Sequence, residues 1–200
     1  MLTTDVNDIK KELLSMMNGP LSQSLREKGV GHRVIFGVEL PRLQSFSEEI
    51  EHSYTLALAL WHENIRECRL LATMIMPHNA LTADEADTWA EEIKYAEEAN
   101  CYVYYLVSHM PFASEKVFQW TAHGGDMQQL CGLLLAGRLL ADGRQFTARD
   151  ETELLDQATA LLSSERFEVK KAAYNLLLRM ADTSLQCARQ VDNILKLHQL

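Results

Sequence analysis

Residues 168–176 read EVKKAAYNL, and this stretch decides the fold class because its apolar and small residues recur at helical spacing. Two further stretches repeat the order of residue types: NIRECRLLA at residues 64–72 and DMQQLCGLL at residues 126–134. In each, an apolar residue is followed by two polar residues and then by mainly small and apolar ones. The sequence therefore predicts three related helices, each beginning near the first residue of its stretch.

This pattern is typical of the inner helix of a HEAT-type repeat, in which small residues permit close packing and leucines fill the core. The spacing between the three stretches is irregular, so the repeat is degenerate. One helix pair cannot bury its apolar face alone, and stacked pairs build one continuous core with a concave side. We expect an all-α fold, an α-α superhelix of degenerate HEAT-like helix pairs, in a single domain over residues 1–200. An irregular helical bundle is the alternative.

Breaking residues and capping signals divide the chain into about ten helices of roughly 8–17 residues. A first helix is expected from about Asp5 to Met17, within an N-terminal part that ends near residue 35. The stretch 28–38 has three glycines and a β-branched run, so we do not expect it to be helical. Capping boxes are indicated at three places: Ser45-x-x-Glu48, Thr82-x-x-Glu85 and, more weakly, Thr147-x-x-Asp150.

The composition narrows the classes of function. The chain has 200 residues and a formal net charge of -9, so a nucleic-acid site would have to be a local basic face. No apolar stretch is long enough to cross a bilayer, and the first twenty residues do not form a signal peptide. We therefore expect a soluble, cytoplasmic protein that does not bind membranes.

The cysteines and histidines do not form a ligand cluster in the sequence. Four cysteines stand far apart in apolar helical patterns, where a thiol behaves as a small hydrophobic group. The seven histidines are scattered without the spacing of a metal site, and no phosphate-cradling glycine motif occurs. The sequence predicts buried, reduced thiols and neither a metal nor a cofactor.

Two further stretches carry a family resemblance. The first, at residues 36–43, reads FGVELPRL and places a proline in the first turn of a helix. The second, at residues 60–72, reads LWHENIRECRLLA; its Leu-Trp closes one helix and its Arg-Glu opens the next. In this order and at this distance, they resemble the DNA alkylation repair family of HEAT-like helical proteins. The resemblance extends over about residues 36–181.

The resemblance implies a curved helical stack whose concave face holds duplex DNA, and an N-glycosylase that releases positively charged alkylated purines. It also implies a carboxylate that stabilises the developing positive charge on the sugar, with aromatic faces around the cationic nucleotide. Basic side chains on the inner helices would hold the phosphates.

The sequence departs from the family pattern where the catalytic residues are expected. In the best local fit, Tyr104 occupies the position of the essential aspartate and Asn100 that of a tryptophan. The helix start at residues 127–130 also lacks the arginine that the family has there. The nearest acids, Glu98 and Glu115, lie several residues from the expected position. The resemblance therefore leaves the catalytic residue unknown.

The candidate DNA-binding residues are basic side chains of the predicted inner helices: Arg66, Arg69, Lys170, Lys171 and Arg138. Solvated surface positions and ordinary ion pairs are the alternative for each of them. The acid-rich segment 84–98 would repel phosphates if it faced a groove, and we expect it to be an outer, solvated helix.

The candidate aromatic groove is formed by Trp61, Tyr102, Tyr104, Tyr105 and Trp120. Aromatic rings stack on nucleobases of any identity, whereas the same rings at helical spacing are commonly part of a core. Tyr102 and Tyr105 share a helix face and Tyr104 points elsewhere, so one exposed tyrosine is expected.

Two functions of different classes follow. The first is a DNA alkylation repair protein that binds duplex DNA and excises alkylated purines. The second is a non-catalytic HEAT-repeat scaffold that binds a protein partner on its concave face. The resemblance supports the first function, whereas the missing carboxylate, the missing arginine and the negative net charge support the second.

Overall fold

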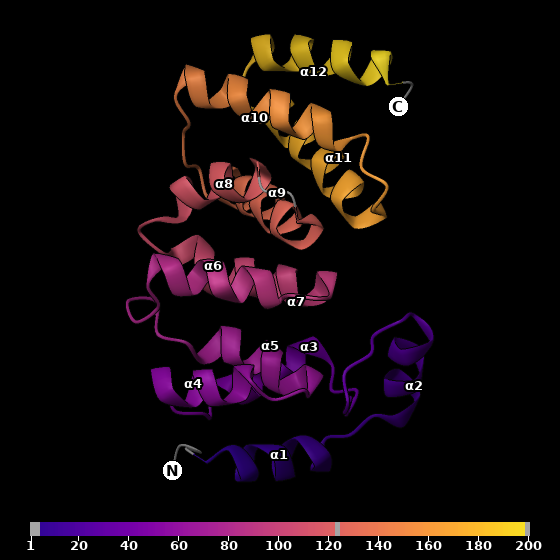
Figure 1. Ribbon diagram of the computed structural model, residues 1–200, viewed down its shortest axis with the longest axis vertical. Helices are drawn as coiled ribbons and strands as arrows, with labels where there is room; N and C mark the ends of the chain where they lie inside the picture. Colours follow the sequence, from indigo (N-terminus) through magenta and orange to yellow (C-terminus); the bar gives the residue numbers. More distant parts are fainter. Residues whose placement is uncertain (1–4, 123–124, 199–200) are drawn as a thin grey trace. The chain divides into compact units, whose positions relative to one another are not determined.

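The computed structural model describes residues 5–122 and 125–198, and these residues form twelve α-helices (Figure 1). A π-helix, η1 (Tyr102–Leu106), and a 3₁₀ turn, η2 (Val107–His109), follow α7. The α-helices are α1 (Val6–Ser15), α2 (Gly19–Glu27), α3 (Leu40–Ser47), α4 (Tyr54–Trp61), α5 (Arg66–Ile75), α6 (Ala83–Glu92), α7 (Ala96–Cys101), α8 (Ala113–Ala122), α9 (Asp126–Ala141), α10 (Ala148–Leu161), α11 (Phe167–Ala181) and α12 (Leu185–Leu197). The all-α prediction is confirmed.

The chain divides into two compact units, residues 1–82 (unit 1) and residues 83–200 (unit 2). Each unit is described by itself below. The single domain expected from the sequence therefore stays a prediction. The three predicted inner helices are present as α5 in unit 1 and as α9 and α11 in unit 2. Their starts lie within two residues of the predicted ones, so this prediction is confirmed.

Unit 1 is built on α5, which packs against α3 and α4. The first helix lies within its predicted range, and the segment 28–39 is non-helical as expected. This segment is fastened to α5 by one buried carboxylate: Glu67 accepts hydrogen bonds from the amides of Phe36, Gly37 and Val38 at 2.9–3.3 Å. Gly37 has a φ of 77°, and an added Cβ would meet Asn18 O at 2.2 Å, so only glycine fits this turn.

The capping signals had different outcomes. Thr147 accepts from the Asp150 amide and Asp150 accepts from the Thr147 amide, so the weakest signal is a complete capping box at α10. The box expected at Ser45 and Glu48 is wrong, because Ser45 lies inside α3 and its hydroxyl donates to Pro41 O. Helix α3 begins earlier because its proline lies in the first turn, where its missing N–H costs no hydrogen bond.

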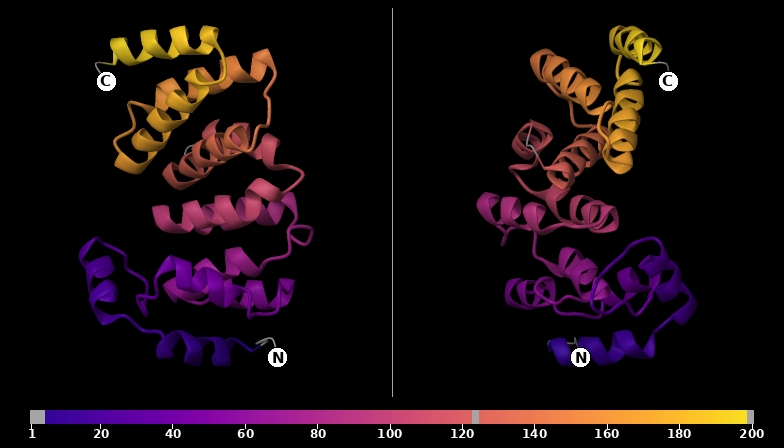
Figure 2. Two further views of the ribbon diagram at one scale, coloured as in Figure 1. Left: turned by 180° about the vertical axis from the view of Figure 1, so that it is seen from behind. Right: turned by 45° about the vertical axis from the view of Figure 1, so that its right-hand side comes forward.

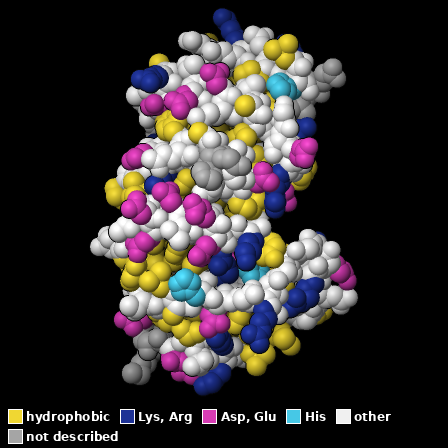
Figure 3. Space-filling view, viewed as in Figure 1, with side chains coloured by type: hydrophobic (Ala, Val, Ile, Leu, Met, Phe, Trp, Pro, Cys, Tyr) yellow, Lys and Arg dark blue, Asp and Glu magenta, His cyan; other side chains and the backbone are white. Residues whose placement is uncertain are grey.

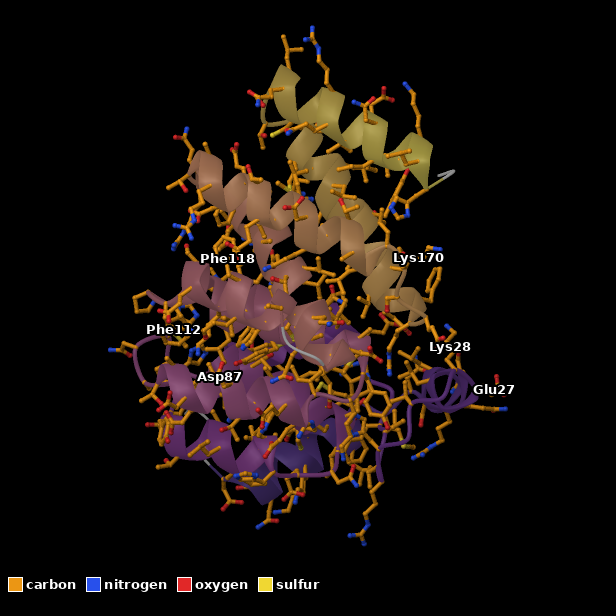
Figure 4. All side chains as sticks on the ribbon, turned by 45° about the horizontal axis from the view of Figure 1, so that its top comes forward. Glu27, Lys28, Asp87, Phe112, Phe118 and Lys170 are labelled. Atoms are coloured by element: carbon orange, nitrogen blue, oxygen red, sulfur yellow. The ribbon has the colours of Figure 1, made fainter. Side chains whose placement is uncertain are left out.

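Unit 2 has two layers of helices (Figure 2). In the inner layer, α7 packs on α9 and α9 packs on α11. In the outer layer, α6 is joined to α8 through Asp87, which accepts from Lys116 Nζ at 2.7 Å and from Trp120 Nε1 at 2.8 Å, and α8 contacts α10. Figure 4 labels Asp87 on α6. Each helix pair of unit 2 (α6 with α7, α8 with α9, α10 with α11) thus contributes one helix to the inner layer. Helix α12 packs on α11.

Gly132 explains how closely α8 and α9 approach each other. An added Cβ would lie 2.7 Å from the Thr121 amide nitrogen of α8. This contact is the close packing for which the small residues in the repeat pattern were predicted.

The acid-rich segment 84–98 is two helices, α6 and the start of α7, rather than the one helix expected. Figure 3 shows acidic side chains gathered over α6, in agreement with a solvated outer helix. Glu98 differs from the rest: it is buried, and its carboxylate accepts a hydrogen bond from the Lys94 amide at the turn between α6 and α7.

The four cysteines are buried and unbridged, as predicted. Burial raises the pKa of Cys68 to about 12, and it raises the pKa of Cys131 as well. Across residues 5–122 and 125–198, every helix is too short or too polar to span a membrane. The same residues contain no group of three His, Cys, Asp or Glu side chains placed to hold a metal ion.

Candidate functional site

A groove of about 300 Å³ runs over the inner layer of unit 2, and we call it the inner groove. It is lined by the end of α7, the start of η1, the second half of α9 and the middle of α11. Valine, leucine and alanine side chains supply its apolar wall. Its polar lining consists of Asn100, Tyr104, Arg138, Asn175 and Arg179.

The π-helix η1 carries the exposed tyrosine of this groove. Tyr102 is buried, and its hydroxyl donates to Ala86 O at 2.7 Å; burial raises the pKa of this phenol. Two residues later, Tyr104 is 48% exposed and lines the groove. The prediction of one exposed tyrosine is therefore confirmed. A π-turn within a helix is frequent at functional sites because it redirects side chains locally.

The Tyr104 ring is held by two neighbours. Tyr105 is half-buried and packs edge-to-face against it, with ring centroids 4.9 Å apart. Burial raises the pKa of Tyr105. From α9, the guanidinium carbon of Arg138 lies 4.5 Å from the Tyr104 ring centroid. Arg138 Nε also lies 3.0 Å from Asp142 Oδ2, one helical turn further along α9. Tyr104 and Arg138 therefore form a cation–π pair that bridges η1 and α9.

Arg179 brings a second guanidinium to the groove from α11. It is exposed, and its Nη1 donates to Gly137 O of α9 at 2.9 Å. This bond uses one of the five N–H donors of a guanidinium. The described residues that line the groove include two arginines and neither an aspartate nor a glutamate. The described lining thus carries two positive charges and no negative one, and Asp142 beside it pairs with Arg138.

Two of the positions at which the sequence departs from the family pattern, residues 100 and 104, line this groove, whereas the helix start at residues 127–130 does not. Asn100 holds its amide through a hydrogen bond from Nδ2 to Ala96 O at 2.7 Å, and Tyr104 lies four residues later. The nearest acids do not line the groove: Glu98 is buried under the turn at Lys94, and Glu115 is exposed on α8, where it accepts from Gln119.

Three of the five aromatic candidates are core residues. Trp61, Tyr102 and Trp120 are buried, and the indole of Trp120 donates to Asp87. For these three residues, the structure favours the alternative interpretation, in which aromatic rings at helical spacing belong to the core and not to a groove. Trp61 lies in unit 1, where Arg69 stacks on its ring with 3.8 Å from guanidinium carbon to centroid.

The basic candidates also differ in their surroundings. Arg66 is 3% exposed, donates to Val38 O and pairs with Glu67 at 2.8 Å, so its side chain serves the interior of unit 1. Arg69 is half-buried against Trp61. Lys170 and Lys171 are exposed on the first turn of α11 outside the groove, and Figure 4 labels Lys170 there. Of the five, Arg138 alone lines the inner groove.

Sequence reasoning missed Arg179 and Asn175. A signal was present, because residues 172, 175, 176 and 179 share one face of a helix, so the face that begins at the predicted inner helix continues to Arg179.

Comparisons with known proteins bear on the fold and on the family. One solved structure comes from a family of proteins related to the HEAT-like repeat DNA glycosylases with affinity for branched DNA structures. It matches 96% of this chain and 82% of its own with a TM-score of 0.84 and 18% sequence identity, and so shows the HEAT-like fold. A search of curated protein sequences finds no match. The family described as DNA alkylation repair enzyme matches residues 9–191. This chain therefore belongs to the DNA alkylation repair enzyme family.

Proposed function

We propose that this protein binds branched DNA through the inner groove of unit 2 and does not excise bases. The observation that carries the proposal is the Tyr104–Arg138 pair. At the position where the family resemblance places the essential carboxylate, the groove presents an aromatic ring with a guanidinium on it.

The chemistry of base release supports the non-catalytic part. Departure of an alkylated purine leaves positive charge on the sugar, and an enzyme lowers the barrier with a preorganised carboxylate. Arg138 would act in the opposite direction, because a cation 4.5 Å from the Tyr104 centroid repels both a cationic base and a developing oxocarbenium ion.

The content of the groove supports DNA rather than a protein partner. Two guanidiniums, an exposed ring and two amides match phosphate and nucleobase chemistry. The affinity for branched DNA that describes the structural neighbour suggests the form of DNA to test.

Fluorescence anisotropy with an immobile four-way junction and a linear duplex of matched sequence tests the binding. We expect tighter binding to the junction, with an affinity that falls linearly with salt on a logarithmic scale. Equal, salt-insensitive binding, or none, would contradict the proposal.

The catalytic part needs a separate assay. Methylated duplex and methylated junction are incubated with the protein, and released 7-methylguanine and 3-methyladenine are measured. We expect no release above the protein-free rate. Release that is lost in the Tyr104→Phe variant would show that the groove is an active site after all.

A further inference from the structure

We propose that Arg138 and Arg179 together form a subsite for one backbone phosphate of a DNA strand at a branch point. The inference rests on the proposed function and deepens it, because it identifies the part of the DNA that the inner groove holds. The two guanidiniums come from neighbouring inner helices, α9 and α11, and both line the same groove.

Each guanidinium is held in place by the protein before any ligand arrives. Arg138 is fixed by the Tyr104 ring on one side and by Asp142 near its Nε. Arg179 is fixed by the carbonyl of Gly137, one residue before Arg138 on α9. Because both side chains are anchored at α9, binding of an anion costs less side-chain entropy than binding by mobile lysines would.

The anchoring contacts leave donors for an anion. A guanidinium has five N–H groups in a planar fork that suits a phosphate, and Arg179 uses one of them on Gly137 O. The ion pair of Arg138 with Asp142 joins Asp142 Oδ2 to Nε at 3.0 Å. The described lining contains no carboxylate, so the carboxylate with which the phosphate shares Arg138 is that of Asp142 beside the groove.

The size of the groove fits one strand. About 300 Å³ lies at the lower end of the range for small-ligand sites, so the groove has room for a phosphate with part of its nucleotide. A strand that leaves its duplex at a branch point presents such an isolated phosphate. The remaining polar groups, the amides of Asn100 and Asn175, are placed to contact the attached sugar or base edge.

A charge-removal cycle tests the subsite. Single neutral methylphosphonate linkages are placed in turn at each phosphate around the branch of a four-way junction. Each junction is titrated with the wild-type protein, Arg179→Gln and Arg138→Gln. The matched control is Lys171→Gln, which removes one positive charge from the same helix as Arg179 but outside the groove.

In the wild-type protein, we expect one linkage position to cost about tenfold in affinity, the size of a charge-assisted hydrogen bond. At that position, Arg179→Gln and Arg138→Gln should each lose clearly less than the wild type, because only one of the two guanidiniums remains, whereas Lys171→Gln should lose as much as the wild type. The salt slope should fall by about one in each groove variant.

Equal losses in the wild type and in Arg179→Gln at every position would overturn the subsite while leaving junction binding, and hence the proposed function, intact. Failure of the wild type to bind any junction would instead overturn the proposed function. If Arg138→Gln does not fold, as judged by thermal unfolding, the exposed Arg179→Gln decides the outcome alone.

Discussion

The guanidinium carbon of Arg138 lies 4.5 Å from the centroid of the Tyr104 ring, although the two residues are 34 positions apart and on different elements. Tyr104 stands where the family resemblance places a carboxylate. The positive charge of Arg138 beside it disfavours a second cation at this position. In the proposed function, this contact makes the position suited to an anion and not to a cationic base.

The first prediction follows from this contact. Restoring the carboxylate by Tyr104→Asp should not produce a glycosylase, because the new aspartate would pair with Arg138 instead of stabilising the sugar. It should weaken junction binding by roughly tenfold, since it neutralises one guanidinium of the groove. Anisotropy titration and a base-release assay measure the two effects.

Tyr104→Phe is the matched control for that variant. It keeps the ring face under Arg138 and removes only the exposed hydroxyl, so junction affinity should stay within about twofold of the wild type. Release of methylated purines by Tyr104→Asp would contradict the prediction and would show that the position alone determines activity.

The second prediction concerns Glu67 in unit 1. Its carboxylate is fully buried, accepts three backbone amides and pairs with Arg66 at 2.8 Å. Glu67→Gln leaves the buried guanidinium without its counter-charge and should lower the free energy of unfolding by about 3–5 kcal/mol. Urea-induced unfolding followed by circular dichroism measures the change.

Glu63→Gln serves as its control. Glu63 also pairs with a base, Lys10, but both side chains are about a third exposed. Such a pair contributes about 0–1 kcal/mol, so the control should unfold close to the wild-type midpoint. A larger loss in Glu63→Gln than in Glu67→Gln would mean that the buried network does not stabilise the 28–39 segment.

The third prediction compares two glycines of α9. An added Cβ at Gly132 would lie 2.7 Å from the Thr121 amide of α8, so Gly132→Ala should force α8 and α9 apart and cost about 1–3 kcal/mol. At Gly137, an added Cβ would meet nothing within 4 Å, so Gly137→Ala should stabilise the helix by about 0.4–1 kcal/mol. Thermal unfolding of both variants should give shifts of opposite sign; shifts of the same sign would contradict the close approach of α8 and α9.

The sequence predicts local features of this fold well and contacts between distant residues poorly. The starts of α9 and α11, the capping box at Thr147 and the exposure of Tyr104 depend on residues within one or two turns, so periodicity was sufficient for them. Arg66 is buried because it donates to Val38 O, in a segment about 30 residues upstream that is itself held by hydrogen bonds to Glu67. The residues next to Arg66 in the sequence do not distinguish it from a solvated arginine.

The candidate site shows the same division. The family resemblance led to positions 100 and 104, and both line the groove. That Arg138 would cover Tyr104, and that Arg179 would join it from α11, required the packing of α7 on α9 and of α9 on α11. The packing of the inner helices on one another, and not any single motif, brings these side chains together.

The last prediction concerns pH. Burial raises the pKa of Cys68 to about 12 and raises that of Cys131, whereas both thiols ionise near 9 in the unfolded chain. Between these values the folded protein keeps protons that the unfolded chain has lost. Stability should therefore be fully present below about pH 9 and should fall as the pH rises above it, by about 1.4 kcal/mol per pH unit for each such thiol.

Urea midpoints measured from pH 7 to pH 11 test this dependence, with Cys68→Ala as the matched variant. The variant has lower stability at pH 7 because it leaves a small cavity, but its midpoint should fall less steeply above pH 9 since one linked proton is gone. Parallel pH profiles for the wild type and the variant would show that Cys68 ionises in the folded state, against its complete burial.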